Sequence, residues 1–199
     1  MEKQKQIRIN ADAQIRSEDD DFLIGYASVF NEQTDLGMFR ESIAPGAFSD
    51  ALARKDDTRV LFNHNPDLLL ARSTNETLVM EEDEIGLRCK IHLPDTTLGN
   101  DLRVLIRQGT ISQMSFGFYI EREEKRGAVE GKPWYEIQSV RLFDVAPVTY
   151  PAYEGTSIKV SRSLEERTAQ IQAREVKESQ LFEYRQRKLQ VSKKRGYRV

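Results

Sequence analysis

The chain has 199 residues and a mass of 23.0 kDa, which predicts one domain with room for a short extension. Hydrophobic residues make up 39% and charged residues 31%, so we expect a packed core and exclude global disorder. The formal net charge of -2 argues against a dedicated nucleic-acid binder, and the single cysteine, Cys89, excludes an intrachain disulfide framework and a zinc-finger ligand set.

The N-terminal part, residues 1–20, is expected to be a flexible arm. Met1 to Asn10 is polar and charged and lacks the apolar core of a signal peptide. No stretch approaches the roughly 20 apolar residues that cross a bilayer, so we expect a soluble, cytoplasmic protein. Phe22–Phe30 is apolar, aromatic and in part β-branched, which predicts a buried strand.

Short elements and turns alternate from Ser49 to Leu93. The predicted elements are a helix over Ser49–Arg54, a strand over Thr58–Phe62, a turn over Asn63–Asp67, and a hairpin of Thr77–Met80 and Gly86–Leu93. The acidic run Glu81–Glu84 connects the two strands of this hairpin. We interpret it as a solvated tip rather than a metal site, because no cluster of His or Cys supplies further ligands.

Thr97–Gln108 has apolar residues at helical spacing, with Thr97 as the expected N-cap and Gly109 at the C-terminal end. A strand over Ile111–Glu121 follows, and then a charged excursion through Gly127 and Gly131. Tyr135–Val145 is the last long strand, and Pro147 and Pro151 end it. The expected body is therefore α+β with antiparallel strands, because the regular βαβ alternation of a parallel sheet is missing.

The C-terminal residues 158–199 differ in charge from the rest. They hold 12 Lys and Arg against 5 Glu, a net charge of +7, whereas residues 1–157 have a net charge of −9. No glycine or proline occurs from Ser157 to Arg195, and apolar residues are sparse. This pattern predicts a long charged helix or a segment that orders on a partner. We therefore expect three parts: the arm 1–20, a domain 21–157 and a basic helical extension 158–199.

Two histidines are present, His64 and His92. His64 follows an apolar strand inside a turn, where it is either an ordinary surface histidine or a functional group held by the strand. His92 lies within Lys90–Pro94, and we expect a strand histidine without a special role.

Ser115 lies in a strand whose residues alternate between two faces. Met114, Phe116, Phe118 and Ile120 share a large apolar face, which must be the core. Ser115 falls on the other face, next to Gly117, which would leave space for a ligand to approach. A plain strand serine is the alternative.

Asp144 stands in an apolar strand, where a carboxylate is costly to bury unless it is paired. Strict alternation places it with Val140, Leu142 and Ala146 on one face. It is either half of a structural ion pair with an arginine or a carboxylate that orients a histidine in a nucleophile–base–orienter triad.

Seven short motifs occur in a characteristic order over roughly residues 20–157. They are Gly25–Phe30, Ile43–Phe48, Leu61–Asp67, Gly86–Leu87, Leu93–Thr96, Met114–Phe118 and Val145–Tyr153. In these motifs the chain resembles the prohead maturation proteases of tailed bacteriophages, which are related to the herpesvirus capsid proteases called assemblins. The resemblance implies a mainly antiparallel, partly closed β-barrel with flanking helices.

The resemblance also implies a serine endopeptidase with His64 as general base and Ser115 as nucleophile. Assemblins have a second histidine as third member, just before a Val-Ala pair, and Asp144 occupies the matching place; Glu82 and Glu84 are competing candidates. The oxyanion hole is expected at the backbone of Ala152 and Tyr153. Neither a cofactor nor a metal is implied.

Proteases of this kind are packaged in the immature capsid, the prohead, within the host cytoplasm. There they remove the scaffolding segment of the major capsid protein, or a separate scaffold, and then cleave themselves. The expected partners are thus capsid protein, scaffold and further copies of the chain, with no membrane and no required nucleic acid. The basic extension is expected to dock on acidic scaffold or capsid helices, or to be a solubilising tail. The alternatives are a non-catalytic capsid assembly module and a small-molecule-binding β-barrel.

Overall fold

The computed structural model describes residues 5–17, 22–150 and 158–194. The chain groups into two compact units, Met1–Ser163 and Leu164–Val199, which we describe separately. The strands are β1 Lys5–Ser17, β2 Phe22–Val29, β3 Thr34–Asp35, β4 Arg40–Ile43, β5 Arg59–Leu61, β6 Leu69–Arg72, β7 Leu78–Glu82, β8 Gly86–His92, β9 Gln113–Val129 and β10 Lys132–Val148. The helices are α1 Ser49–Ala53, α2 Thr97–Arg107, α3 Ile158–Lys194 and the single 3₁₀ turns η1 Phe62–His64 and η2 Ser73–Asn75.

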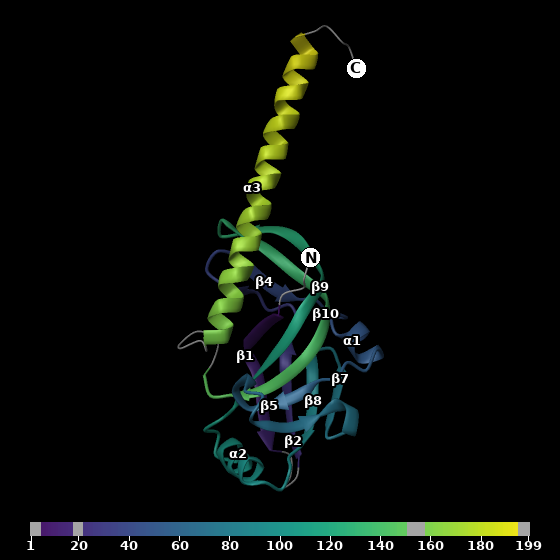
Figure 1. Cartoon of the computed structure of the whole chain (residues 1–199), viewed down its shortest axis with the longest axis vertical. Helices are drawn as coiled ribbons and strands as arrows, with labels where there is room; N and C mark the ends of the chain where they lie inside the picture. The colour runs from purple at the N-terminus through teal and green to yellow at the C-terminus, as the bar shows by residue number, and fades with distance from the viewer. Residues whose placement is uncertain (1–4, 18–21, 151–157, 195–199) are drawn as a thin grey trace. The chain divides into compact units, whose positions relative to one another are not determined.

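The ten strands form one mixed, mostly antiparallel sheet (Figure 1), which confirms the α+β class. Its order is β3-β4-β10-β9-β1-β2-β8-β7, with β5 pairing β10 and β6 pairing β5. The pairings of β10 with β4 and with β5 are parallel.

The expected partly closed barrel is not found. Along the described strands the sheet is an open path that ends at β3 and β7. Two short strands, β4 and β5, share the outer edge of β10, and the path beyond β4 ends in the two-residue β3. Because the outer edge of β10 is divided between two separate short ladders, neither ladder continues to β7 among the described strands.

A single large hydrophobic core takes side chains from both ends of this path. Leu78 of β7 and Ile91 of β8 belong to the same cluster as Val60 of β5 and Ile43 of β4. The predicted apolar face of β9 is confirmed, because Met114, Phe116 and Phe118 are buried in this cluster. Burial of such apolar surface is the main force that holds the sheet around one centre.

The segment expected to be a flexible arm instead forms β1 in the middle of the sheet. Lys5 to Ile9 pair with β9, and Ile15 to Ser17 pair with β2. The polar composition of this segment suggested an exposed arm, but some of its polar side chains are buried in ion pairs. Arg8 is 7% exposed, and its guanidinium contacts both carboxylate oxygens of Glu41, with Nη2 to Oε2 at 3.1 Å.

Two local predictions also needed correction. The N-cap of α2 is Thr96 rather than Thr97, since the Thr96 hydroxyl accepts a hydrogen bond from Gly99 N–H. The charged excursion is a hairpin, in which β9 and β10 continue to a turn at Glu130 and Gly131 with φ of 51° and 75°. Positive φ at both positions matches the right-handed twist of the flanking strands.

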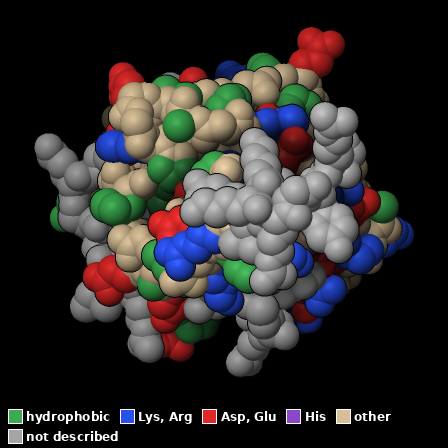
Figure 2. Space-filling view, turned by 90° about the horizontal axis from the view of Figure 1, so that it is seen from above, with side chains coloured by type: hydrophobic (Ala, Val, Ile, Leu, Met, Phe, Trp, Pro, Cys, Tyr) green, Lys and Arg blue, Asp and Glu red, His purple; other side chains and the backbone are tan. Residues whose placement is uncertain are grey.

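The second unit consists of most of helix α3, which confirms a helix where one was predicted. Its apolar residues Leu181, Phe182 and Tyr184 are exposed. Among the described helices, none is long and apolar enough to cross a membrane. Figure 2 shows one face of the molecule, on which acidic and basic side chains lie interspersed. The boundary near residue 158 remains a prediction.

Candidate active site

His64 ends the strand–turn segment β5–η1 in an unusual backbone conformation. Asn63 and His64 both have left-handed φ, 53° and 55°. Two consecutive residues of this kind are disfavoured for L-amino acids and are typical of functional sites. The turn points the imidazole inward, so that His64 is 5% exposed rather than a surface histidine.

Asn63 ties this turn to the end of β10. Its Oδ1 accepts a hydrogen bond from Thr149 N–H at 2.9 Å, and its Nδ2 donates to Thr149 Oγ1 at 2.9 Å. An asparagine tolerates the left-handed region better than most residues and offers both a donor and an acceptor. The backbone that carries His64 is therefore held on the strand that carries Asp144.

A β-bulge in β10 sets the direction of Asp144. Leu142 pairs with Phe118 of β9, but the next paired residue of β10 is Asp144, opposite Gly117, so Phe143 is extra. A bulge of this kind re-aims the side chains that follow it. Asp144 thus shares the face of Ser115 and Gly117 rather than that of Leu142, and the expected strict alternation is wrong here.

Gly117 provides room for this carboxylate. A Cβ built on Gly117 would lie 2.2 Å from Asp144 Oδ1 and 2.4 Å from the Phe143 ring. The sequence predicted that this space would admit an approaching ligand. The structure fills it with Asp144 and the bulged Phe143 instead.

The three buried side chains form a continuous hydrogen-bonded chain. His64 Nδ1 lies 2.9 Å from Asp144 Oδ1, and His64 Nε2 lies 2.6 Å from Ser115 Oγ. Because a carboxylate accepts but cannot donate, Nδ1 carries the proton and Nε2 is left as an acceptor. Ser115 is 0% and Asp144 1% exposed, so these bonds form where water competes little.

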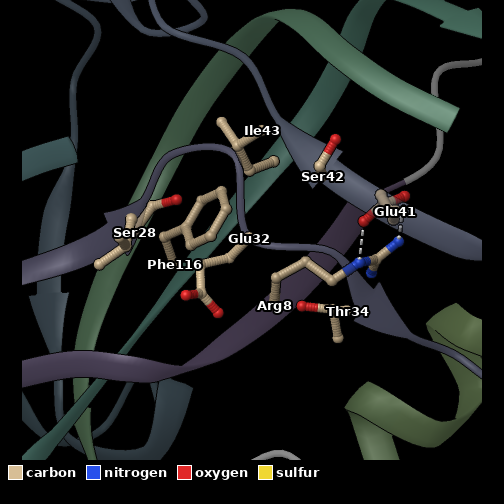
Figure 3. A pocket seen from close by; sticks show the side chains of 9 residues that line it. Arg8, Ser28, Glu32, Thr34, Glu41, Ser42, Ile43 and Phe116 are labelled. Carbon is tan, nitrogen blue, oxygen red and sulfur yellow. Dashed lines mark hydrogen bonds and ion pairs between the residues drawn. The ribbon is translucent and has the colours of Figure 1, made fainter. Parts of the chain in front are cut away.

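Ser115 has a second neighbour that the sequence did not reveal. Its Oγ lies 2.8 Å from the backbone carbonyl oxygen of Arg8 in β1. A serine hydroxyl has one proton, so the Arg8 carbonyl and His64 Nε2 compete for it. The Arg8 side chain lines a cavity of about 20 Å³ and is paired with Glu41 (Figure 3), which ties β1 to β4. Backbone pairing from Lys5 to Ile9 holds β1 beside the nucleophile strand β9.

Of the competing carboxylates of the acidic hairpin tip, Glu82 has partners elsewhere and Glu84 is exposed. Glu82 accepts hydrogen bonds from Gly46 N–H and, at 2.9 Å, from the Ser49 hydroxyl at the start of α1. In the part of the chain that the structure describes, no group of three His, Cys, Asp or Glu side chains is placed to hold a metal ion.

His92 and Cys89 do not join this arrangement. His92 is exposed at the end of β8, with its ring 5.1 Å from that of Phe22. Ala152 and Tyr153, the expected oxyanion donors, lie outside the described residues. Cys89 is fully buried, and burial raises the pKa of its thiol to about 12, so it supplies no thiolate nucleophile.

The model of the Caudovirus prohead serine protease family matches residues 10–171. The chain belongs to this family. The prohead protease of Enterobacteria phage HK97 is 32% identical to it over 143 residues, which are 71% of this chain and 60% of that protein. The chain therefore matches about 60% of the length of this curated relative.

The fold has a solved counterpart. The structure of the bacteriophage T4 capsid assembly protease, gp21, matches with a TM-score of 0.51 and 12% sequence identity, over 74% of this chain and 99% of that chain. At this identity the likeness concerns the fold alone.

Proposed function

We propose that this member of the prohead serine protease family is a serine endopeptidase with Ser115 as nucleophile, His64 as general base and Asp144 as orienting carboxylate. The observation that carries the proposal is the hydrogen-bonded chain from Asp144 Oδ1 through His64 to Ser115 Oγ, at 2.9 and 2.6 Å. Nucleophile, base and orienting group in this order are recognised by geometry rather than by their order in the chain.

In the proposed mechanism, His64 Nε2 accepts the hydroxyl proton as Ser115 Oγ attacks the scissile carbonyl carbon. Asp144 holds the Nδ1 proton and stabilises the imidazolium that forms. His64 then gives the proton to the leaving amine, and water hydrolyses the acyl-enzyme by the same route in reverse. The backbone near Ala152 and Tyr153 would donate to the oxyanion.

Access to the nucleophile belongs to this proposal. Ser115 has no exposed surface in this structure, and its proton has the Arg8 carbonyl as an alternative acceptor. Cleavage therefore requires a conformation in which a peptide carbonyl reaches Oγ and the proton bonds to His64. Such a requirement suits an enzyme that must stay inactive until its substrate is assembled around it.

The substrate we propose is the scaffolding segment of the major capsid protein, or a separate scaffold, inside the prohead in the host cytoplasm, followed by the protease itself. The family and the HK97 relative support a role in prohead maturation. The basic residues 158–199 would dock on acidic capsid or scaffold helices, because opposite charges steer association.

The test is co-expression of the chain with the major capsid protein of the same phage, followed by mass measurement of both. We expect cleavage by the wild-type chain and none by Ser115→Ala. Ser28→Ala is the matched control, because Ser28 is also fully buried but its hydroxyl has no hydrogen-bond partner among the described residues. A thiol-alkylating reagent should leave cleavage unchanged, since Cys89 is buried and protonated.

Undiminished cleavage by Ser115→Ala would refute the nucleophile assignment. Intact capsid protein in the presence of the wild-type chain, with both proteins assembled into proheads, would instead favour a non-catalytic assembly module.

A further inference from the structure

The segment from the end of α1 to η1 lies along β10 and is attached to it at three places. At one end, Arg54 and Asp56 contact the backbone of β10 at Val140 and Leu142. In the middle, Arg59 and Val60 of β5 pair with Asp144 and Val145. At the other end, Asn63 is bonded to Thr149. Asp144 lies between these outer attachments, and His64 directly follows the last of them.

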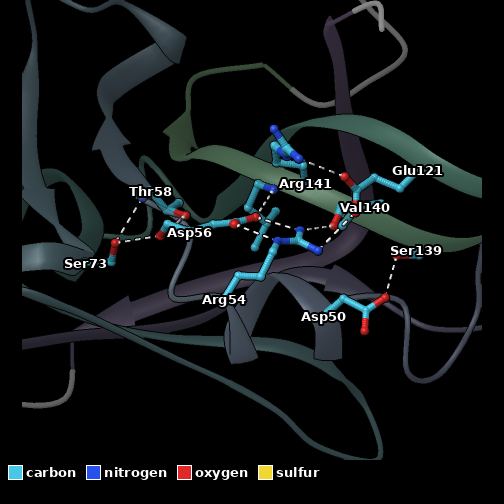
Figure 4. Close-up of polar contacts among 10 residues, drawn as sticks. Asp50, Arg54, Asp56, Thr58, Ser73, Glu121, Ser139, Val140 and Arg141 are labelled. Carbon is cyan, nitrogen blue, oxygen red and sulfur yellow. Dashed lines mark hydrogen bonds and ion pairs between the residues drawn. The ribbon is translucent and has the colours of Figure 1, made fainter.

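Arg54 and Asp56 hold the backbone just before the bulge (Figure 4). The Asp56 carboxylate accepts a hydrogen bond from Leu142 N–H at 3.1 Å. Arg54 donates from Nη2 to the Val140 carbonyl oxygen at 3.1 Å. The two side chains also form a double hydrogen bond with each other, Nε to Oδ1 and Nη2 to Oδ2, both at 3.1 Å.

The end of α1 places this pair. Lys55 has φ of 55°, its N–H donates to the Leu52 carbonyl, and Asp56 N–H donates to the Ala51 carbonyl. This pattern is the Schellman motif, which ends helices at a left-handed residue. Next in the chain, Thr58 N–H is bonded to Ser73 Oγ at 3.0 Å. The backbone on both sides of Asp56 is therefore fixed.

A second acidic group, Glu121, also contacts Arg54. Arg54 Nη1 donates to Glu121 Oε2 of β9 at 3.1 Å, and Glu121 Oε1 also faces Arg141 at 3.3 Å. The Asp56 hydrogen bond is the main cause that raises the pKa of Arg54 above its usual range. The guanidinium stays charged and binds α1, β9 and β10 together.

We propose that Arg54 and Asp56 are positioning residues that keep the β10 bulge in place and so aim Asp144 at His64; the inference rests on the proposed function. The physical reason is that successive side chains of a strand point to opposite faces of the sheet. If the bulge relaxed by one residue, every later side chain of β10 would change faces, and Asp144 would turn from His64 toward the core. Asp56 opposes this change by binding the N–H of Leu142.

Asp56→Ala removes the acceptor for Leu142 N–H, and Asp56→Asn keeps an oxygen there while it loses the charge. We expect the rate of capsid protein cleavage to fall about 10- to 100-fold in the alanine variant, as for a misplaced reacting group, with partial recovery in Asp56→Asn. Asp57→Ala is the matched control. The neighbouring Asp57 binds Arg72 through two hydrogen bonds of 2.7 Å and, among the described residues, forms no hydrogen bond or ion pair with β10, so its removal should leave the rate unchanged.

A proton spectrum separates positioning from general destabilisation. The Nδ1 proton of a histidine bonded to a carboxylate resonates far downfield, and with two histidines in the chain a His92→Gln variant identifies the His64 signal. We expect this signal in the wild type and in Asp57→Ala. It should be shifted or lost in Asp56→Ala and be restored in part in Asp56→Asn, at a temperature where all variants are folded by circular dichroism.

The outcomes distinguish this inference from the proposed function. A wild-type chain that shows the downfield signal but never cleaves capsid protein would contradict the proposed function. A wild-type chain that cleaves, together with Asp56→Ala and Asp56→Asn variants that keep both the rate and the signal, would overturn the positioning role. An equal loss in Asp57→Ala would also overturn it, because that residue lacks the contact with β10.

Discussion

The two histidines of the chain lie in regions of opposite character. His64 is 5% exposed, follows another left-handed residue and has a hydrogen bond on each ring nitrogen. His92 lies at the exposed end of β8, in an ordinary antiparallel pair with Phe22. The side chains are identical, so the difference arises from the backbone that carries them.

The strands beside the two histidines differ in the same way. The pairing of β8 with β7 is unbroken from Leu78↔Ile91 to Glu82↔Leu87. The pairing of β10 with β9 shifts register four times, and one of these shifts lies immediately before Asp144. Both pairs of strands contribute to the core, but the irregular backbone of β10 also places a polar group where regular alternation would not allow it.

The largest expected difference between the two regions is in catalysis. Asp144→Asn should lower the cleavage rate by about 10⁴-fold, because an amide that donates to Nδ1 leaves the imidazole in the wrong tautomer to accept the serine proton. His92→Gln, the control from the other region, should cleave at the wild-type rate. The measurement is the rate of capsid protein cleavage by quantitative mass spectrometry.

Equal rates for Asp144→Asn and the wild type would remove Asp144 from the proposed triad. A comparable loss in His92→Gln would mean that the contrast between the two regions does not reflect function.

A smaller effect is expected where the structure makes room for Asp144. Gly117→Ala places a methyl group 2.2 Å from Asp144 Oδ1, so the carboxylate or the strand must move. A displacement of about 1 Å at a reacting group lowers rates about 100-fold, and we expect a loss of this size. The check is the cleavage rate of Gly117→Ala beside that of Ser28→Ala. Unchanged cleavage would show that Asp144 tolerates displacement.

The sequence predicted the regular parts of this molecule well. The strand at Phe22–Phe30, the helix at Thr97–Gln108 and the apolar face of β9 follow from periodicity and apolar content, which depend on near neighbours along the chain. It missed β1, whose buried Arg8 has its partner Glu41 33 residues away. Pairing over such a distance leaves no local pattern.

The sequence predicts which three residues form the candidate site, but it does not predict how their side chains are arranged. Single residues and family motifs point to His64, Ser115 and Asp144, and the structure brings these three within hydrogen-bonding distance. The face of Asp144 was predicted wrongly, because a bulge depends on the partner strand and on Asp56 rather than on residues 140–146 alone. Gly117 indicates open space beside Ser115 in the sequence, but Asp144 and Phe143 of β10 fill that space in the structure.

The smallest expected effect concerns the strained turn. Asn63→Ala loses both side-chain bonds to Thr149 and puts a residue poorly suited to φ of 53° before His64, so we expect a loss of about 2 kcal/mol in the free energy of unfolding. Asn63→Gly loses the same bonds but accepts positive φ, and should lose about 1 kcal/mol. Urea denaturation measures both, with His92→Ala as the unstrained control. If Asn63→Ala and Asn63→Gly were equally stable, the left-handed backbone at Asn63 would not be a source of strain, and the hydrogen bonds between Asn63 and Thr149 alone would explain how this turn is held on β10.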